Sequence, residues 1–467
     1  MDIELFATPG LGDTSYLIAS EGEAALIDPQ RDAWRFLAVA EARGWRVTYV
    51  LETHVHNDYL SGALETRAAT GATIVAPARG GYAFVHLGAD EGTSIEIGAL
   101  RLTAMATPGH TPEHLAWAFR AAGASSASGS TDANPEGVFT GGSLLVGSAG
   151  RTDLLGEART DELTRLQATS LQRLAALPPA TRILPTHGGG SFCSAGPAAT
   201  SSSTSVGAEM VGNAALRAAP TPTFHDVLVG SLGRYPDYYA RMAPLNRAGP
   251  GILGGAPSPA ALDPEAFAAA MDRGILVLDA RPRAAFAKVH LPGSLNIELD
   301  DGFAAYVGWL VPFNAPLALV VPEPGPAAAV EAATELVRVG YEQVAGFLAG
   351  GVEAWTSAGR PVRSYATTVI EDLLGEVSQG AQPDILDVRQ EVEWRTGGLI
   401  PGSRTIFVAD LPGRLGELPR DHEITILCKG GSRAAIGASI LDAAGIPVRL
   451  VASGGATGWA EKFARVR

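Results

Sequence analysis

Cysteine is scarce in this chain, since Cys193 and Cys428 are the only two among 467 residues. Two cysteines cannot build a disulfide framework, so each thiol must be judged by its own surroundings. Basic residues are also in the minority: 35 Lys and Arg face 49 Asp and Glu, which gives a formal net charge of −14. A surface of this charge disfavours nucleic acid and anionic membranes as partners.

Long apolar runs are missing as well. No stretch approaches the roughly 18 apolar residues that a membrane helix needs, and the first residues lack the basic and apolar segments of a signal peptide. We therefore expect a cytoplasmic protein. Hydrophobic residues still make up 46% of the chain, and domains of roughly 100 to 200 residues would divide it into two to four parts.

The first 190 residues alternate short apolar strands with helical stretches, which predicts a layered α/β domain. The expected strands are 24–28, 47–51, 72–76 and 100–106, and the expected helices are 33–43 and 161–174. Ser, Thr, Ala and Gly dominate residues 191–206, which predicts an irregular segment. A glycine-proline cluster at 249–251 looks like a linker. We expect a first domain over 1–256, including a C-terminal extension.

The second half contains an internal repeat. Residues 277–281 (Val-Leu-Asp-Ala-Arg) recur at 385–389 (Ile-Leu-Asp-Val-Arg), a separation of 387 − 279 = 108 residues. Two further pairs keep nearly the same spacing: 291–294 with 400–403, and 350–355 with 454–459. One period implies one repeated structural unit. We expect two α/β domains, 257–364 and 365–467, each with helices on both faces of a parallel sheet.

The second repeat carries a cysteine in a glycine-rich turn between an apolar strand and a helix. Cys428 is followed by Lys429, Gly430, Gly431 and Ser432, and then by Arg433. Backbone amides of a tight turn, the start of a helix and nearby cations all stabilise negative charge on sulfur. The pattern predicts a reactive thiolate, with an inert buried thiol and a phosphatase-like use of the cysteine and arginine as alternatives.

With its Asp-Val-Arg and Ile-Pro-Gly-Ser segments, this repeat resembles the rhodanese family. The resemblance implies that Cys428 carries sulfane sulfur as a persulfide with Arg433 as a catalytic partner. It also implies that Lys429, Gly430, Gly431 and Ser432 bind substrate. Alignment of the repeats places Val321 at the position of Cys428. The first repeat therefore resembles inactive rhodanese modules, whose role is packing or docking.

Histidines cluster after three expected strands of the first domain. Residues 53–59 contain His54, His56 and Asp58, residues 107–114 contain His110, and residues 184–188 contain His187. Loops at strand ends can bring such side chains together, and glycines beside the latter two clusters allow sharp turns. This pattern predicts a metal site.

These segments resemble the metallo-β-lactamase fold superfamily, within it the persulfide dioxygenase and glyoxalase II branch. The resemblance implies an αββα sandwich. A persulfide dioxygenase uses non-haem Fe(II) to convert a low-molecular-weight thiol persulfide and oxygen into sulfite and thiol. Two positions depart from the family pattern: Tyr59 replaces a histidine, and Gly142 replaces an aspartate. A dinuclear hydrolase site is therefore disfavoured.

What remains is His54, His56 and His110 for one metal position, with Asp58 and His187 as remnants of a second. Fe(II) is the favoured metal, Zn(II) is the alternative, and loss of metal binding stays open. Asp153 and Asp132 are candidate replacements for the missing carboxylate.

Three further residues resemble segments of fusions between dioxygenase and rhodanese domains. They are Cys193, which could relay sulfur, and Tyr238 and Arg247, which could shape a substrate pocket; burial or helix packing explains them equally well.

The leading functional hypothesis is an enzyme of sulfide and persulfide metabolism, a persulfide dioxygenase-like metal domain coupled to a rhodanese sulfurtransferase. Its expected small-molecule partners are thiol persulfides, thiosulfate or sulfite, and a homo-oligomer stays open. The alternatives are a zinc-dependent thioester hydrolase and a metal-free scaffold with sulfurtransferase activity alone.

Overall fold

The computed structural model describes residues 1–122, 134–196 and 201–464. These divide into two compact units, Met1–Ala256 with Val337–Gly340, and the remainder from Pro257 on. Among the described residues, no helix combines the length and apolarity needed to cross a membrane.

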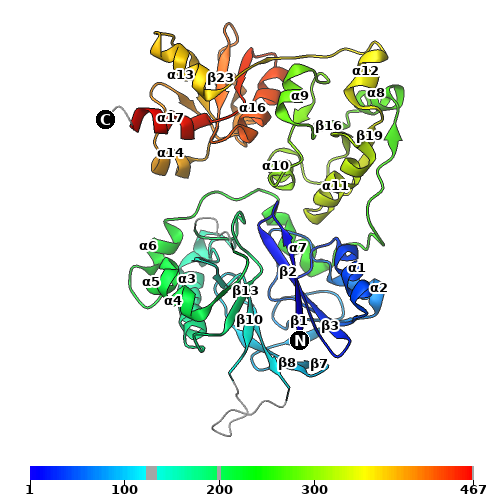
Figure 1. Cartoon of the computed structure of the whole chain (residues 1–467), viewed down its shortest axis with the longest axis vertical. Helices are drawn as coiled ribbons and strands as arrows, with labels where there is room; N and C mark the ends of the chain where they lie inside the picture. Colours follow the sequence, from blue (N-terminus) through cyan, green and yellow to red (C-terminus); the bar gives the residue numbers. More distant parts are fainter. Residues whose placement is uncertain (123–133, 197–200, 465–467) are drawn as a thin grey trace. The chain divides into compact units, whose positions relative to one another are not determined.

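The N-terminal unit holds two six-stranded sheets (Figure 1). The first has the order β1-β2-β3-β4-β5-β6, formed by Asp2–Thr8, Asp13–Ser20, Glu23–Ile27, Arg46–Leu51, Thr73–Pro77 and Leu87–Ala89. The second has the order β14-β13-β10-β9-β8-β7, formed by Thr204–Ser205, Arg182–Pro185, Gly137–Gly141, Leu115–Ala121, Leu100–Ala106 and Ser94–Ile97. A small hairpin joins β11 (Leu144–Leu145) and β12 (Ser148–Ala149).

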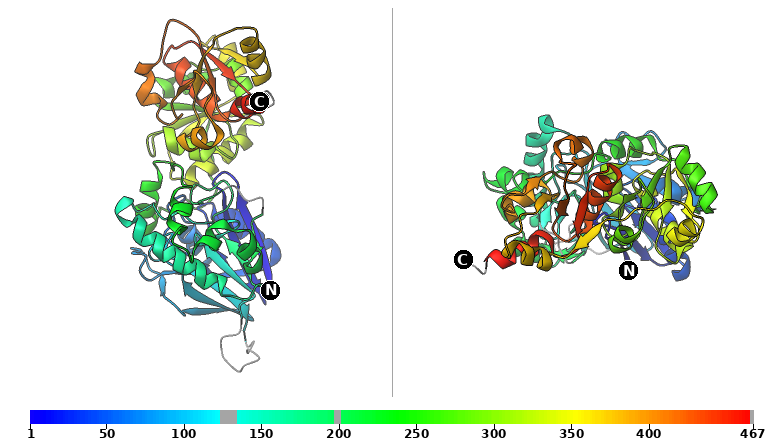
Figure 2. Two further views of the ribbon diagram at one scale, coloured as in Figure 1. Left: turned by 90° about the vertical axis from the view of Figure 1, so that its left-hand side faces the viewer. Right: turned by 90° about the horizontal axis from the view of Figure 1, so that it is seen from above.

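Helices cover the outer faces of both sheets (Figures 1 and 2). On the first sheet lie α1 (Ala33–Arg43) and α2 (Ala63–Thr70), whose apolar faces share a core with its strands. The second sheet packs against α3 (Glu157–Ala175), α4 (Val206–Gly212), α5 (Ala214–Ala218) and α6 (Phe224–Val229). Helix α7 spans Tyr239–Ala248. The predicted αββα sandwich is confirmed.

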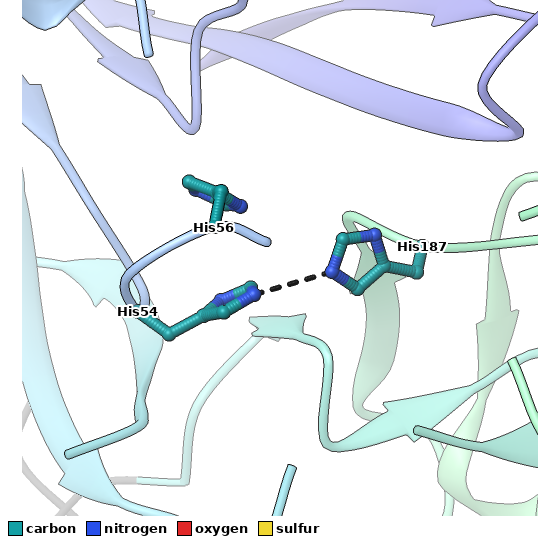
Figure 3. Close-up of side chains that lie close together, drawn as sticks. All are labelled: His54, His56 and His187. Carbon is teal, nitrogen blue, oxygen red and sulfur yellow. Dashed lines mark hydrogen bonds between the residues drawn. The ribbon is translucent and has the colours of Figure 1, made fainter. Parts of the chain in front are cut away.

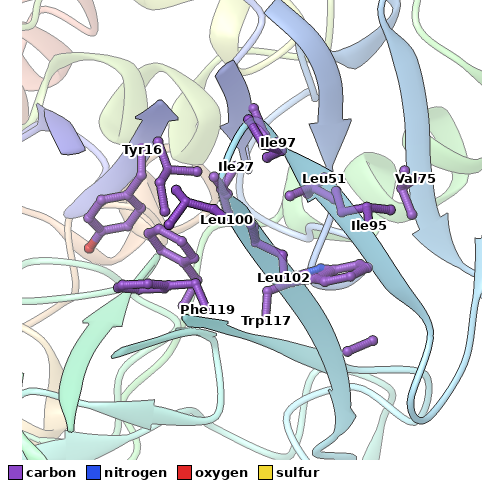
Figure 4. Packing of buried hydrophobic residues seen from close by; sticks show 14 of the residues in the cluster. Tyr16, Ile27, Leu51, Val75, Ile95, Ile97, Leu100, Leu102, Trp117 and Phe119 are labelled. Atoms are coloured by element: carbon purple, nitrogen blue, oxygen red, sulfur yellow. The ribbon is translucent and has the colours of Figure 1, made fainter. Parts of the chain in front are cut away.

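A third apolar cluster fills the space between the sheets (Figure 4). Tyr16, Leu51 and Val75 from the first sheet meet Trp117 and Phe119 from the second, and all five side chains are buried. Alternation along the strands directs these residues inward. The packed interior fixes the strand ends from which the candidate site is built.

The C-terminal unit contains two five-stranded parallel sheets of the same order, β15-β19-β18-β16-β17 and β20-β24-β23-β21-β22. The first repeat comprises β15 (Ala261–Leu262), α8 (Pro264–Asp272), β16 (Leu276–Asp279), α9 (Arg283–Lys288), β17 (Leu295–Asn296), α10 (Phe303–Leu310), β18 (Leu317–Val320), α11 (Gly325–Arg338), β19 (Val344–Leu348) and α12 (Gly351–Ser357).

The second repeat comprises β20 (Ala366–Thr368), α13 (Ile370–Ser378), β21 (Asp384–Asp387), α14 (Glu391–Gly397), β22 (Arg404–Thr405), α15 (Leu411–Arg414), the short 3₁₀ helix η1 (Leu415–Glu417), β23 (Ile424–Leu427), α16 (Ser432–Ala443), β24 (Val448–Val451) and α17 (Gly455–Ala464). The shared strand order confirms that the sequence repeat is a structural one. The boundaries 1–256, 257–364 and 365–467 are kept as proposed domain limits.

Candidate functional site

Strand ends bring the predicted histidines together. His54 and His56 follow β4, His110 follows β8 and His187 follows β13, and all four side chains are buried. The rings of His54 and His110 are in edge contact, with their centroids 5.0 Å apart. Ligand nitrogens of His54, His56 and His187 lie within 4.8 Å of one another, from two separate loops (Figure 3). The cluster thus centres on His187, which the sequence assigned to a second position.

Hydrogen bonds fix the tautomers of His54 and His110. The Thr53 hydroxyl donates to Asp28 Oδ2 (2.7 Å), so it can only accept from His54 Nδ1 (2.8 Å). His110 Nδ1 lies 2.8 Å from the carbonyl of Arg151, to which it must donate. Each imidazole therefore presents its Nε2 lone pair to the cluster, and His110 Nε2 has no hydrogen-bond partner among the described residues.

His56 turns the opposite nitrogen toward the cluster. Its Nε2 lies 3.1 Å from Glu52 Oε2 and 3.3 Å from Asp28 Oδ1, which are both acceptors, so Nε2 carries a proton. Its Nδ1 has no partner among the described residues. A buried nitrogen without a partner costs free energy that a bound cation would recover.

His187 and His54 face each other through their Nε2 atoms at 3.2 Å (Figure 3). His187 Nδ1 contacts Asp13 Oδ1 (2.8 Å) and Asp58 Oδ2 (3.2 Å). Two lone pairs at this distance repel unless a proton or a metal cation lies between them. Burial opposes a charge on His187, but Asp58 and Asp13 outweigh it and raise its pKa to about 10. The surroundings of His187 therefore favour positive charge at this point.

The donor set fits a divalent metal. Ligand nitrogens of His54, His56 and His187 form one buried group, and those of His110 and His187 form a second group with the sulfur of Cys193. Buried carboxylates contact the other nitrogen of two of these rings: Glu52 and Asp28 at His56, and Asp13 and Asp58 at His187. Carboxylates hydrogen-bonded to the far side of ligand histidines orient the rings and increase their basicity. Imidazole ligands suit zinc and iron alike, so the arrangement does not select between these metals.

The two departures from the family pattern have structural consequences. The Tyr59 ring stacks on His56 with centroids 4.3 Å apart, and its hydroxyl donates to the Asp28 carbonyl (3.1 Å). At Gly142, a β-carbon would lie 2.2 Å from Cδ2 of His110, so the His110 ring closes over this position. The backbone N–H of Gly142 donates to His114 Nε2 (2.9 Å), which uses the lone pair of His114.

The other site candidates of this domain lie close by in supporting positions. The Tyr238 hydroxyl donates to the Asp58 carbonyl (2.8 Å), and Arg247 Nε donates to the Gly80 carbonyl (2.9 Å). Cys193 is fully buried, and its sulfur lies within 4.8 Å of ligand nitrogens of His110 and His187. Burial, followed by Asp58 and Asp13, raises the Cys193 thiol pKa well above its usual value.

Asp153, one of the two candidate replacement carboxylates, is not placed as a metal ligand. Arg151 binds Asp153 through Nε (2.6 Å) and Nη2 (2.8 Å). Asp132 lies outside the described residues. Sequence reasoning missed Gln167 of α3, whose side chain accepts from His110 N (3.1 Å) and donates to the Ser143 carbonyl (2.8 Å). No local motif marks it, because it joins loops that are distant in the chain.

A second site surrounds Cys428, which directly follows β23. Its sulfur accepts the Gly431 N–H (3.0 Å), and α16 starts at the next residue, Ser432. Arg433 forms a two-point ion pair with Glu393, so its charge is offset. The cavity next to the sulfur has a volume of about 450 Å³. Its lining residues are Asp300, Asp301, Gly302, Tyr306, Cys428, Gly430, Ser432 and Arg433.

The site and fold define a metal-binding domain of the metallo-hydrolase type joined to two domains of the sulfurtransferase type. The metallo-beta-lactamase superfamily model matches residues 8–187, and the rhodanese-like domain model matches 263–358 and 370–462. The chain belongs to the metallo-β-lactamase superfamily and carries two rhodanese-like domains.

Curated relatives and a solved structure agree with this assignment. A hydroxyacylglutathione hydrolase from Cereibacter sphaeroides is 32% identical over 194 residues, covering 40% of this chain and 67% of that protein. A probable metallo-hydrolase from Burkholderia pseudomallei is 33% identical over 223 residues, covering 40% and 72%. The structure of a metallo-beta-lactamase from Staphylococcus aureus subsp. aureus COL is 27% identical, with a TM-score of 0.64, and covers 74% of this chain and 98% of that one.

Proposed function

We propose that the chain is an enzyme that processes sulfur at two sites. In the N-terminal unit, oxygen would oxidise a low-molecular-weight thiol persulfide to sulfite and thiol at a bound metal, and Cys428 would exchange sulfane sulfur with small thiols or sulfite. The observation that carries this proposal is the combination in one chain of a buried imidazole cluster and a cysteine whose sulfur accepts a backbone N–H in the loop that leads into α16. Both sites suit substrates that contain sulfur.

His54, His56, His110 and His187 are the residues that would hold the metal. A bound Fe(II) supplies open positions for a thiolate and for oxygen, whereas a bound Zn(II) supplies a Lewis acid. The chain itself orients the ligands, because Thr53 and Asp28 fix His54, and Asp13 fixes His187. These contacts hold the free nitrogens in position before substrate arrives.

At the second site, the loop of Cys428 stabilises negative charge on sulfur. The Gly431 N–H points at the sulfur, and the start of the 12-residue helix α16 lies beside it. Arg433 and Ser432 line the same cavity, and the Ser432 hydroxyl accepts from Arg283, which leaves its own proton available to donate to a substrate. The phosphatase-like alternative gains no support, because the Arg433 guanidinium is engaged by Glu393.

Thioester hydrolysis is the second candidate for the N-terminal site. The relatives named hydroxyacylglutathione hydrolase favour it, since they are about one-third identical over the metal domain. A dinuclear site for that chemistry is disfavoured, because Tyr59 and Gly142 stand where the family pattern has a histidine and an aspartate. A mononuclear zinc site would be required.

One assay separates the two candidates. The purified holoprotein is given either glutathione persulfide with oxygen or an acyl-glutathione, and oxygen uptake, sulfite and released thiol are measured. Oxygen uptake with sulfite formation supports persulfide oxidation, and release of thiol without oxygen supports hydrolysis. Neither reaction, in protein with full metal content, would overturn both assignments.

A further inference from the structure

The cavity of Cys428 is built by both repeats of the C-terminal unit. The repeat with the cysteine supplies the sulfur and its loop, and the repeat without a cysteine supplies Asp300, Asp301 and Tyr306. The two aspartates precede α10, and the tyrosine lies on it. A domain that cannot carry a persulfide thus forms one wall of the reactive site.

This wall is tied to the sulfur loop by Arg283. Its guanidinium donates to Ser432 Oγ (3.0 Å) and to the Ala452 carbonyl (3.2 Å), which both belong to the second repeat. Glu298 holds the same guanidinium by an ion pair of 2.5 Å. Arg283 therefore links Glu298, which lies two residues before Asp300, to the loop of Cys428.

The residues that line the cavity carry more negative than positive charge. Asp300 and Asp301 are exposed carboxylates, and Arg433, the one cation among the lining residues, is already paired with Glu393. Lys429, next to Cys428, is exposed but does not line the cavity. A doubly charged anion approaching Cys428 is repelled, and a cation is attracted.

We propose that Asp300 and Asp301 select the sulfur donor of Cys428: a thiol persulfide with an ammonium group near its sulfur is favoured, and inorganic dianions such as thiosulfate are disfavoured. This inference rests on the proposed sulfur transfer at Cys428. In that step the Cys428 thiolate attacks the terminal sulfur of the donor persulfide and forms a new S–S bond. The S–S bond of the donor breaks, its electron pair stays on the departing thiolate, and that thiolate takes a proton from water.

Charged thiol reagents test the selection directly in the full chain. Rates of Cys428 modification by a trimethylammonium-ethyl and a sulfonato-ethyl methanethiosulfonate are compared, with the modified peptide identified by mass. The cationic reagent should react faster by roughly tenfold at low salt, and the double variant D300N/D301N should reduce this ratio about three- to tenfold. The ratio should also fall with ionic strength. The double variant D272N/E331Q removes two exposed carboxylates of the same repeat outside the cavity and should leave the ratio unchanged.

Sulfur loading of Cys428 from cysteamine persulfide and from thiosulfate completes the test. Faster loading from the cationic donor, with a thiosulfate rate that rises in D300N/D301N, supports the inference. An unchanged reagent ratio and unchanged donor preference in D300N/D301N would overturn it while sulfur transfer itself stands. No persulfide on Cys428 from any donor would instead overturn the proposed function, and the donor class with it.

Discussion

At the scale of single residues, Gly142 controls the position of His110. A β-carbon at Gly142 would lie 2.2 Å from the His110 ring, which is held from behind by the Arg151 carbonyl. The ring has little freedom to retreat, because Gln167 also binds its backbone. The absence of a side chain at residue 142 therefore leaves room for the His110 ring in the proposed metal site.

The variant Gly142→Ala should weaken metal binding about 10- to 100-fold, the range seen when support around a ligand histidine is lost. Titration of the apoprotein with Zn²⁺ measures this effect. Gly188→Ala is the matched control, since a β-carbon there finds its nearest atom at 3.6 Å, although it adjoins His187. Equal affinity in Gly142→Ala and the unmodified protein would contradict the account.

The histidines could be predicted from sequence because residue type and position after a strand are local signals. The residues that orient these histidines could not be predicted from sequence. Asp28 illustrates this, because its carboxylate binds Thr53 and Thr186, which lie 25 and 158 residues away. Such contacts form only when the sheets fold, so the spacing of residues in the sequence does not predict them.

At the scale of elements, the two repeats differ at one backbone donor. Val321 follows β18 as Cys428 follows β23, and α11 and α16 start four residues later in both cases. In this register Pro324 stands at the position of Gly431, whose N–H binds the sulfur. Proline has no N–H, so the first loop lacks this donor.

A thiol placed in the first repeat should therefore stay inactive. We expect Cys428→Ser to abolish sulfur transfer. The double variant Val321→Cys/Cys428→Ser should be equally inactive. Addition of Pro324→Gly should raise the reactivity of the new thiol toward iodoacetamide. Recovery of transfer by Val321→Cys without the change at Pro324 would show that the backbone donor is not needed.

The repeated Gly-Gly pairs are not equivalent. A β-carbon on Gly455 would lie 2.0 Å from the Cys428 carbonyl oxygen, whereas one on Gly351 finds its nearest atom, of Glu323, at 4.0 Å. Gly455→Ala should cost about 1–3 kcal/mol of stability by overpacking and reduce sulfur transfer. Gly351→Ala, also at a positive φ, should keep transfer intact. Thermal unfolding and transfer rates compare the pair, and equal losses would refute a special role for Gly455.

The repeat itself was readable from the sequence, since its motifs recur at the ends of equivalent strands. The cavity that the two repeats share could not be predicted from the sequence. Asp300 and Asp301 are ordinary surface residues in the sequence, and only the packing of α10 beside the loop of Cys428 places them at the reactive sulfur. The contact between Arg283 and the loop of Cys428 could not be predicted for the same reason.

At the scale of the whole molecule, the metal site and Cys428 belong to different compact units. A chelator should therefore abolish the reaction of the N-terminal unit and leave sulfur transfer at Cys428 within about twofold of its starting rate, because Cys428 needs no metal to act as a nucleophile. Both activities are measured on the same sample before and after dialysis against chelator. A parallel loss of both would show that transfer depends on the metal.

The metal content of protein purified without added metal tests most directly whether the buried imidazoles form a metal centre. We expect about one equivalent of iron or zinc, as in a mononuclear site, and its loss in the variant His54→Ala/His110→Ala. The variant His225→Ala/His422→Ala, which removes two exposed imidazoles, should keep the metal. A folded protein without metal, or full metal content in His54→Ala/His110→Ala, would contradict the claim that the buried imidazoles form a metal centre.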